Sequence, residues 1–256
     1  MIHPTAIVHP NATLASDVEV GAYSIIGEHV EIGAGTVIGP HVVINGHTRI
    51  GQHNRIFQFC SLGEIPQDKK YAGEPTRLEI GDHNTIREFC TFNLGTAQDV
   101  GVTRLGNHNW IMAYVHLAHD CQIGNNTIFA NNSQLAGHVT VGDYAILGGF
   151  TVVHQFVRIG AHIITGMGTI LFQDVPPYVL ASGNPCAPHG INSEGLKRRG
   201  FSSASIMAIK RAYKTLYRSG LSLDEARQAI QLQVAEHAEL QPLVEFLAGA
   251  ERGVVR

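Results

Sequence analysis

Histidine is the residue type whose number and spacing in this sequence point to chemistry. Four of the fifteen histidines stand close together, at His116, His119, His138 and His154. Imidazole gains or loses a proton near neutral pH, so a group of histidines suits general acid–base catalysis. We therefore look for a catalytic site in this stretch and ask what positions its side chains.

A six-residue repeat sets those positions. An apolar residue recurs at every sixth position from Ile2 to Leu62, and the pattern resumes from Ile80 to about Leu171. This period matches neither a helix nor a plain strand, so it indicates a repeat architecture. Three hexapeptides form one triangular coil of a left-handed parallel β-helix, and we predict this mainly β fold for residues 1–190. The next residue is often glycine, as tight corners with unusual backbone angles require; examples are Gly21, Gly27, Gly33, Gly39 and Gly51.

The predicted coils convert sequence spacing into geometry. Each coil holds three hexapeptides, and stacked coils lie about 4.8 Å apart, so a residue lies beneath the residue eighteen positions later. This places His119 beneath Gly137 and Gly137 beneath Gln155, while Asp120 lies beneath His138. Acyl transfer needs a general base beside a bare backbone N–H that can receive an oxyanion. His119 and Gly137 fit these two roles.

Three alternative interpretations of the histidines stay open. Isolated outward-facing histidines on a repeat surface carry no chemistry, which we expect of His3, His9, His29, His41 and His53. Zinc is a second alternative, because His116 and His119 have a His-x-x-His spacing. Residues three apart on a flat coil do not converge on one ion as they would on a helix, so we expect no metal. A non-catalytic solenoid is the third alternative.

Two segments interrupt the repeat and should project from the coils as loops. Residues 63–79 and 93–104 are polar and contain glycine, and the first also contains proline. Loops on a rigid scaffold commonly carry function. In the first loop, Gln67, Asp68 and Lys70 are candidates to hold a polar ligand, although an ordinary solvated loop would have a similar composition.

A small helical domain is predicted for residues 191–256, after a segment rich in Pro and Gly that breaks the repeat. Ser202 or Ser203 suits the N-cap of a long amphipathic helix. Ser222 and Glu225 have the spacing of a capping box, which predicts the start of the next helix.

Composition argues against a nucleic-acid-binding or membrane-spanning protein. Charged residues make up 15% of the chain and the formal net charge is −3, so no basic surface is expected. There is no apolar run of membrane-spanning length and no signal-peptide pattern. Cys60, Cys90 and Cys121 occupy the small-residue position of the repeat, which predicts buried thiols. We expect a cytoplasmic protein.

Several segments together resemble one known family. They are HLAHDC (116–121), LAGHVTV (135–141), VVHQF (152–156), QDVPPYV (173–179) and GINSEGLKRRGFS (190–202). The sequence resembles the UDP-N-acetylglucosamine acyltransferases, which catalyse the first step of lipid A biosynthesis, and the resemblance covers essentially the whole chain. It implies transfer of a 3-hydroxyacyl group from acyl carrier protein to the sugar 3-hydroxyl. It also implies a homotrimer with sites between subunits, and no cofactor besides the carrier's phosphopantetheine.

The resemblance also implies roles for individual residues. His119 matches the family's general base, Asp120 the acid that orients it, and Gly137 the oxyanion-binding amide. Neighbouring strand side chains point to opposite faces, so contact between His119 and Asp120 needs a corner or a bend. The matched substrate-binding residues are His116, His138, His154 and Gln155 around sugar, nucleotide and donor, Asp68 and Lys70 in the first loop, and Asn192, Glu194, Arg198 and Arg199 for nucleotide and carrier protein.

Met167 matches the position that ends the acyl groove in this family. It should lie one coil above Gly149, which lies one coil above Asn131. Methionine there should plug a groove that glycine would leave open. One coil of about 4.8 Å corresponds to roughly four methylenes, so an acyl chain of about ten to twelve carbons is expected.

One departure from the family bears on the acceptor. Where the family commonly has Ile-His-Arg-Gly-Thr, this chain has Phe92-Asn93-Leu94-Gly95-Thr96. Loss of a His and an Arg beside the second loop leaves open a 3-amino analogue of the sugar as the acceptor. An amine would also need a base, so His119 does not distinguish the two acceptors.

Overall fold

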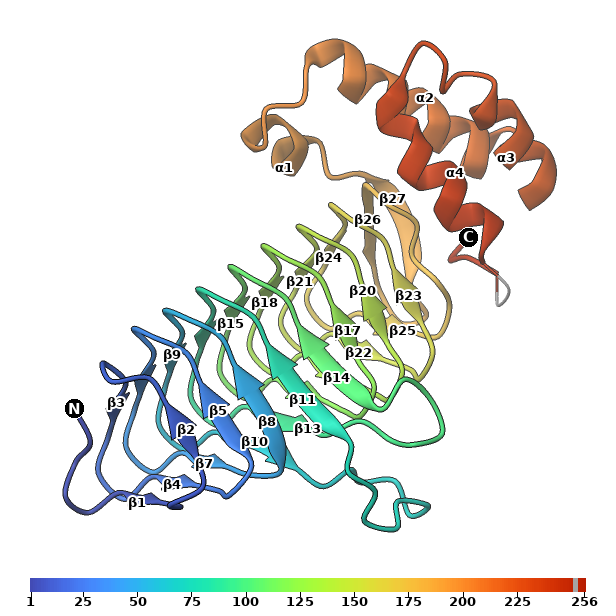
Figure 1. Cartoon of the computed structure of the whole chain (residues 1–256). Helices are drawn as coiled ribbons and strands as arrows, with labels where there is room; N and C mark the ends of the chain where they lie inside the picture. Colours follow the sequence, from blue (N-terminus) through green and yellow to red (C-terminus); the bar gives the residue numbers. More distant parts are fainter. Residues whose placement is uncertain (251–252) are drawn as a thin grey trace.

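The repeats form the predicted left-handed parallel β-helix, and a helical domain covers one of its ends (Figure 1). A computed structural model of the chain describes residues 1–250 and 253–256. Three sheets make the three faces of the coils, and their strands are parallel except for the last pair of the third sheet. Short strands follow one another from face to face, so each sheet collects every third strand of the repeat.

The strands of the three faces, in sheet order, are as follows. The first sheet contains β1 (Ile7–Val8), β4 (Ile25–Ile26), β7 (Val43–Ile44), β10 (Ser61–Glu64), β13 (Thr91–Asn93), β16 (His116–Leu117), β19 (Gln134–Leu135), β22 (Val152–Val153) and β25 (Ile170–Leu171). The second contains β2 (Thr13–Leu14), β5 (Val30–Ile32), β8 (His47–Ile50), β11 (Arg77–Ile80), β14 (Val102–Leu105), β17 (Gln122–Ile123), β20 (Thr140–Val141) and β23 (Arg158–Ile159). The third contains β3 (Glu19–Val20), β6 (Val37–Ile38), β9 (Arg55–Ile56), β12 (Thr85–Ile86), β15 (Trp110–Ile111), β18 (Ile128–Phe129), β21 (Ile146–Leu147), β24 (Ile164–Thr165), β26 (Val179–Ser182) and β27 (Ala187–Ile191).

The apolar residue of each hexapeptide points into the coil and stacks on its counterpart in the next coil. Leu117 pairs in register with Leu135, and Leu135 with Val153. All three are buried in one continuous core that runs along the coils. A two-residue strand has little stability of its own, so this stacking stabilises the fold. Truncating one core residue, as in Leu135→Ala, should cost about 2–5 kcal/mol.

The repeat glycines are required for a different reason from the one predicted. Gly21 and Gly33 do not have positive φ; a Cβ on Gly21 would instead lie 2.6 Å from the carbonyl carbon of Gly39 in the next coil. Close approach of neighbouring coils therefore requires glycine there. The left-handed conformation falls two residues later, for example at Tyr23 (φ 59°) and His41 (φ 57°).

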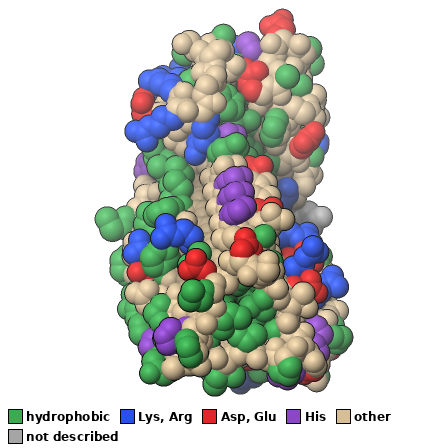
Figure 2. Space-filling view, turned by 60° about the vertical axis from the view of Figure 1, so that its left-hand side comes forward, with side chains coloured by type: hydrophobic (Ala, Val, Ile, Leu, Met, Phe, Trp, Pro, Cys, Tyr) green, Lys and Arg blue, Asp and Glu red, His purple; other side chains and the backbone are tan. Residues whose placement is uncertain are grey.

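Side chains at these left-handed corners stack into columns along the helix. The rings of Tyr23 and His41 are 5.2 Å apart, and the rings of His83 and His108 are 4.8 Å apart and nearly parallel. Stacking of this kind helps to offset the cost of a left-handed non-glycine residue, about 1–2 kcal/mol. Figure 2 shows histidine side chains gathered in a column on one face of the coils. His41 stacks between Tyr23 and Phe59, so it has a structural role.

Both interruptions of the repeat are projecting loops, as predicted (Figure 1). They are shorter than the sequence suggested, since β10 extends to Glu64 and β11 begins at Arg77. Likewise β13 ends at Asn93 and β14 begins at Val102. Hydrogen bonds join the two loops at their bases. The Leu94 N–H donates to the Glu64 carbonyl, and the Arg77 N–H donates to the Gly101 carbonyl.

The chain leaves the β-helix through the antiparallel pair β26 and β27, so the predicted boundary at residue 190 falls inside β27. The helices are α1 (Ser193–Arg198), α2 (Ser203–Arg218), α3 (Leu223–Gln231), a 3₁₀ helix (Ala238–Leu240) and α4 (Gln241–Ala248). Ser202 caps α2, and Ser222 with Glu225 forms the predicted capping box of α3. These helices enclose a second apolar core. Among the described residues, none of the helices has the length and apolar character to cross a membrane.

Candidate active site

His119 and Asp120 form a hydrogen-bonded pair at a corner of the coil. His119 Nδ1 lies 3.0 Å from Asp120 Oδ2. On a flat strand these side chains would point to opposite faces, but Asp120 has φ 59°, and this left-handed corner turns its carboxylate toward the neighbouring imidazole. With the proton on Nδ1 directed at Asp120, Nε2 of His119 is available as a base.

The Asp120 carboxylate is almost fully buried and held by the second loop. It accepts hydrogen bonds from the Thr96 backbone N–H (3.0 Å) and the Thr96 hydroxyl (2.6 Å). The Asp120 N–H donates to Thr103 Oγ1 at 2.8 Å. A buried carboxylate needs such donors to offset the loss of water. No motif in the sequence marks Thr96 or Thr103, and only their place in the predicted loop 93–104 hinted at them; in the structure Thr103 lies in β14.

Gly137 lies directly over the His119 ring, as the eighteen-residue spacing between stacked coils predicted. A Cβ at Gly137 would lie 2.4 Å from Cε1 and 2.6 Å from Nε2 of His119. Glycine is therefore required for the ring to occupy this place. Within residues 1–250 and 253–256, the Gly137 N–H donates no hydrogen bond. The site thus combines an oriented imidazole with a free backbone N–H beside it.

His138 is held from three sides. Its ring stacks on Phe156 at 4.3 Å and meets His119 edge-on at 4.8 Å. Its Nδ1 lies 2.5 Å from Oδ2 of Asp99, a residue of the second loop that the sequence analysis did not single out. Asp120 Oδ2 is also near, at 3.9 Å.

His116 is turned toward a different partner. Its Nδ1 lies 2.7 Å from the Thr91 hydroxyl. Burial is the main effect on the pKa of His116 and lowers it. The hydrogen bond with Thr91 opposes this effect, and the charge of His119 lowers the pKa further. His116 is therefore neutral at neutral pH and suits hydrogen bonding to a substrate.

A metal ion would need ligands that the site already uses otherwise. In the described part of the chain, the potential ligand atoms of His119, Asp120 and His138 lie within 4.8 Å of one another. The Asp120 carboxylate is engaged by His119 and by Thr96. His116 is not a member of this group, so the His-x-x-His spacing does not converge on one ion. The arrangement fits a hydrogen-bonded catalytic pair better than a zinc site.

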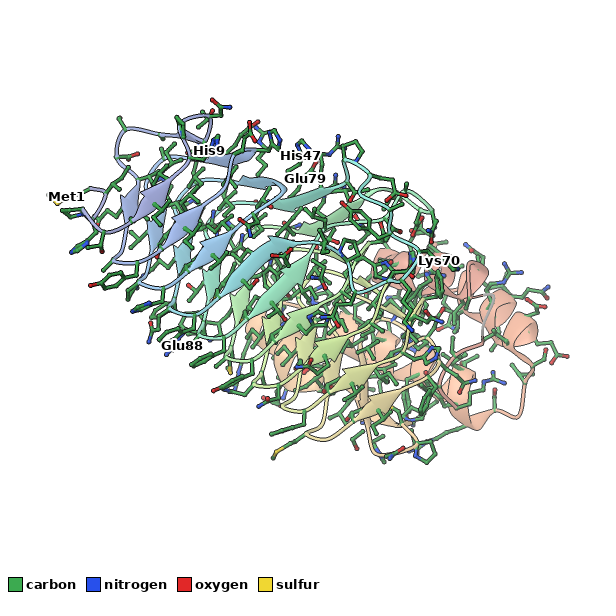
Figure 3. All side chains as sticks on the ribbon, turned by 90° about the horizontal axis from the view of Figure 1, so that it is seen from below. Met1, His9, His47, Lys70, Glu79 and Glu88 are labelled. Carbon is green, nitrogen blue, oxygen red and sulfur yellow. The ribbon has the colours of Figure 1, made fainter. Side chains whose placement is uncertain are left out.

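The side chains of His116, His119 and His138 line a pocket of about 830 Å³ beside the two loops. Lys70, labelled in Figure 3, lies on the first loop at the edge of the β-helix. The loops supply a cation and carboxylates, and the coils supply the imidazoles. The lining residues are Gln67, Asp68, Lys70, Gln98, Asp99, His116, Ala118, His119, Ala136, Gly137, His138, Gln155 and Phe156.

Met167, Gly149 and His154 lie outside this pocket. The Gly168 N–H donates to the Gly149 carbonyl and the Phe150 N–H to the Asn131 carbonyl, so the predicted column order is confirmed. Met167 is 78% exposed. His154 is also exposed, with its ring tilted against Phe172 at 5.9 Å.

The predicted residues of the helical domain are likewise separate from the pocket. Asn192 caps α1 and donates from Nδ2 to the His162 carbonyl, while Glu194 pairs with Lys197 at 2.7 Å. Arg198 is exposed. Arg199 donates to the Tyr144 carbonyl and lies over the Tyr144 ring, 5.1 Å from its centre. A single chain therefore does not bring these residues to His119.

The unusual Asn93 and Leu94 are buried beneath the loops rather than in the pocket. Asn93 is 5% exposed and donates from Nδ2 to the Ile65 carbonyl, at the start of the first loop. Leu94 belongs to the apolar core and would meet any side chain placed at Gly46. Through these contacts both residues support the loops.

Comparisons with known proteins show which family the chain is similar to. The family model described as "Udp N-acetylglucosamine O-acyltransferase; Domain 2" matches residues 174–255, and that of the bacterial transferase hexapeptide repeats matches residues 1–34 and 103–137. The acyl-[acyl-carrier-protein]–UDP-N-acetylglucosamine O-acyltransferase of Thiobacillus denitrificans is 67% identical, over 100% of this chain and 99% of its own.

Solved structures give the same result. LpxA from Acinetobacter baumannii superimposes with a TM-score of 0.98 at 49% identity, covering 100% of this chain and 99% of the other. The UDP-N-acetylglucosamine acyltransferase of Arabidopsis gives a TM-score of 0.85 at 32% identity, with both chains fully covered. The chain belongs to the UDP-N-acetylglucosamine O-acyltransferase family.

Proposed function

We propose that this enzyme transfers a 3-hydroxyacyl group from acyl carrier protein to the 3-hydroxyl of UDP-N-acetylglucosamine, the first step of lipid A biosynthesis. The observation that supports this most is the oriented His119–Asp120 pair beneath the free N–H of Gly137. The names of highly similar relatives state the same donor and acceptor.

In the proposed mechanism, His119 Nε2 removes the proton from the sugar 3-hydroxyl as its oxygen attacks the thioester carbonyl. The carbonyl oxygen becomes an oxyanion, which the Gly137 N–H stabilises. The carbonyl re-forms, the carbon–sulfur bond breaks, and the leaving thiolate takes the proton from His119. Asp120 stays ionised throughout and stabilises the imidazolium.

We also propose how the substrates are held. Lys70, in the pocket wall, suits the diphosphate of the nucleotide sugar because phosphate is anionic. Asp68, Gln67 and Gln155 supply hydrogen-bonding groups to the same pocket. Phosphopantetheine on the carrier protein carries the acyl group, and the chemistry needs no other cofactor.

A neighbouring subunit would complete the site. Asn192, Glu194, Arg198, Met167 and His154 lie outside the pocket that one chain forms. A homotrimer with sites between subunits would let these residues of one subunit meet the pocket of another, and exposed arginine such as Arg198 suits an acidic carrier protein. We propose this assembly, and a cytoplasmic location.

The 3-hydroxyl is the preferred acceptor of the two considered. Asn93 and Leu94 had suggested a 3-amino sugar, but both are buried under the loops. The relatives' names specify O-acyl transfer. For the donor, Met167 favours a chain of about ten to twelve carbons, since one coil spacing corresponds to about four methylenes.

The test is an acyl-transfer assay with 3-hydroxyacyl carrier proteins of several lengths, and with UDP-N-acetylglucosamine or its 3-amino analogue as acceptor. Transfer to the ordinary sugar, abolished by His119→Ala, is expected. His119 lies outside the apolar core, so circular dichroism and thermal melting should show a folded variant. Transfer only to the amino analogue would overturn the proposed acceptor. Retained activity in His119→Ala would overturn the mechanism.

A further inference from the structure

One turn of the second loop contacts both carboxylate–histidine pairs of the pocket. At its start, Thr96 donates two hydrogen bonds to Asp120, the partner of His119. At its end, Oδ2 of Asp99 lies 2.5 Å from Nδ1 of His138. The turn from Thr96 to Asp99 thus supports the His119–Asp120 pair and supplies the carboxylate of a second pair, Asp99–His138, beside it.

The surroundings of His138 fix the plane of its ring but not the position of its proton. Phe156 lies parallel to the ring (interplanar angle 3°) and His119 is nearly perpendicular (86°). These contacts restrain the plane but do not determine which nitrogen carries the proton. Nδ1 faces two carboxylates, Asp99 at 2.5 Å and Asp120 at 3.9 Å, so a proton is favoured on Nδ1.

We propose that Asp99 is a positioning residue that holds His138 in the Nδ1–H form, so that Nε2 accepts a hydrogen bond from a hydroxyl group of the bound substrate. Across residues 1–250 and 253–256, Nε2 of His138 has no hydrogen-bond partner. His138 lines the same pocket as His119 and Gly137. This role rests on the proposed function, in which both the sugar and the 3-hydroxyacyl group carry hydroxyls.

Two substitutions distinguish the role of Asp99 as a hydrogen-bond acceptor from the role of its charge. Asp99→Ala removes the acceptor, so the proton of His138 can move to Nε2 and the substrate hydroxyl loses its acceptor. Asp99→Asn keeps an oxygen that can accept the Nδ1–H. A buried polar group left without its hydrogen-bond partner costs about tenfold or more, so we expect that loss in kcat/KM for Asp99→Ala. Asp99→Asn keeps the acceptor for the Nδ1–H and should recover to within about threefold of wild type.

Val100→Ala is the matched control, because Val100 is the next residue of the loop, is 57% exposed and does not line the pocket. It should keep wild-type kinetics. All variants are assayed as the full-length protein with 3-hydroxyacyl carrier protein and UDP-N-acetylglucosamine.

The second readout is the ¹⁵N NMR spectrum of histidine-labelled protein, in which His138→Gln identifies the His138 signals. Wild type and Asp99→Asn should show Nδ1 protonated, and Asp99→Ala should show the proton shifted toward Nε2. An unchanged tautomer in Asp99→Ala, activity of that variant within about threefold of wild type, or an equal loss in Asp99→Asn would each overturn the role of Asp99. Failure of the proposed function is distinguishable, since wild type would then be inactive while the NMR comparison still reports on Asp99.

Discussion

Substitution of Gly137 by alanine should inactivate the enzyme by displacing His119. The added Cβ would lie 2.4 Å from Cε1 of His119, about 1 Å short of an ordinary carbon–carbon contact. The ring must move by about that distance, which stretches its 3.0 Å contact with Asp120. A misplacement of about 1 Å in a reacting group can lower the rate about 100-fold. We therefore expect at least that loss in kcat/KM.

The assay measures acyl transfer under single-turnover conditions, so that product release does not hide the chemical step. Gly27→Ala is the control, because its Cβ would meet Asn45 Oδ1 at 3.1 Å and no catalytic group. Both variants should remain folded, since His119 faces the pocket rather than the core. Gly137→Ala with activity within about threefold of wild type would refute the placement of His119 against Gly137.

Three further predictions concern the groove, the loop and a buried histidine. Met167→Gly should lengthen the preferred acyl chain by about four methylenes, measured by competition among carrier proteins of different chain lengths; an unchanged preference would contradict the groove assignment. Thr96→Val removes the hydroxyl that donates to Asp120 and should lower kcat about tenfold with little change in KM, whereas a change in KM alone would indicate a binding role. Burial and the charge of Arg199 lower the pKa of His162 from 6.5 to about 4. The unfolded chain therefore binds more protons between these values, and stability is lost as pH falls from about 6.5 to 4. The His162 ring stacks on Tyr144 and Tyr178. His162→Phe, which keeps this stacking, should reduce the difference in melting temperature between pH 7 and pH 5, and an undiminished difference would argue against His162.

The sequence was sufficient to predict the fold, because only one packing of the chain is consistent with the six-residue period. Apolar residues that recur at this spacing face inward only in triangular coils, and their register then places His119 under Gly137 without further information. The same periodicity misled on the repeat glycines. Gly21 follows the pattern of a strained corner, yet the tight contact with Gly39 of the next coil is what requires glycine, and the strain falls on Tyr23.

The tertiary structure determined the contacts of the site that the six-residue repeat does not specify. Contact between His119 and Asp120 depends on a left-handed corner that sequence spacing alone does not reveal. Thr96 and Asp99 reach the pocket because the second loop folds back on the coils, and a loop without a repeat has no register that fixes its position. The sequence by itself therefore determined the scaffold and the column of the general base, since these follow from local periodicity. The partners that orient the two imidazoles come from long-range contacts, which only the folded chain brings together.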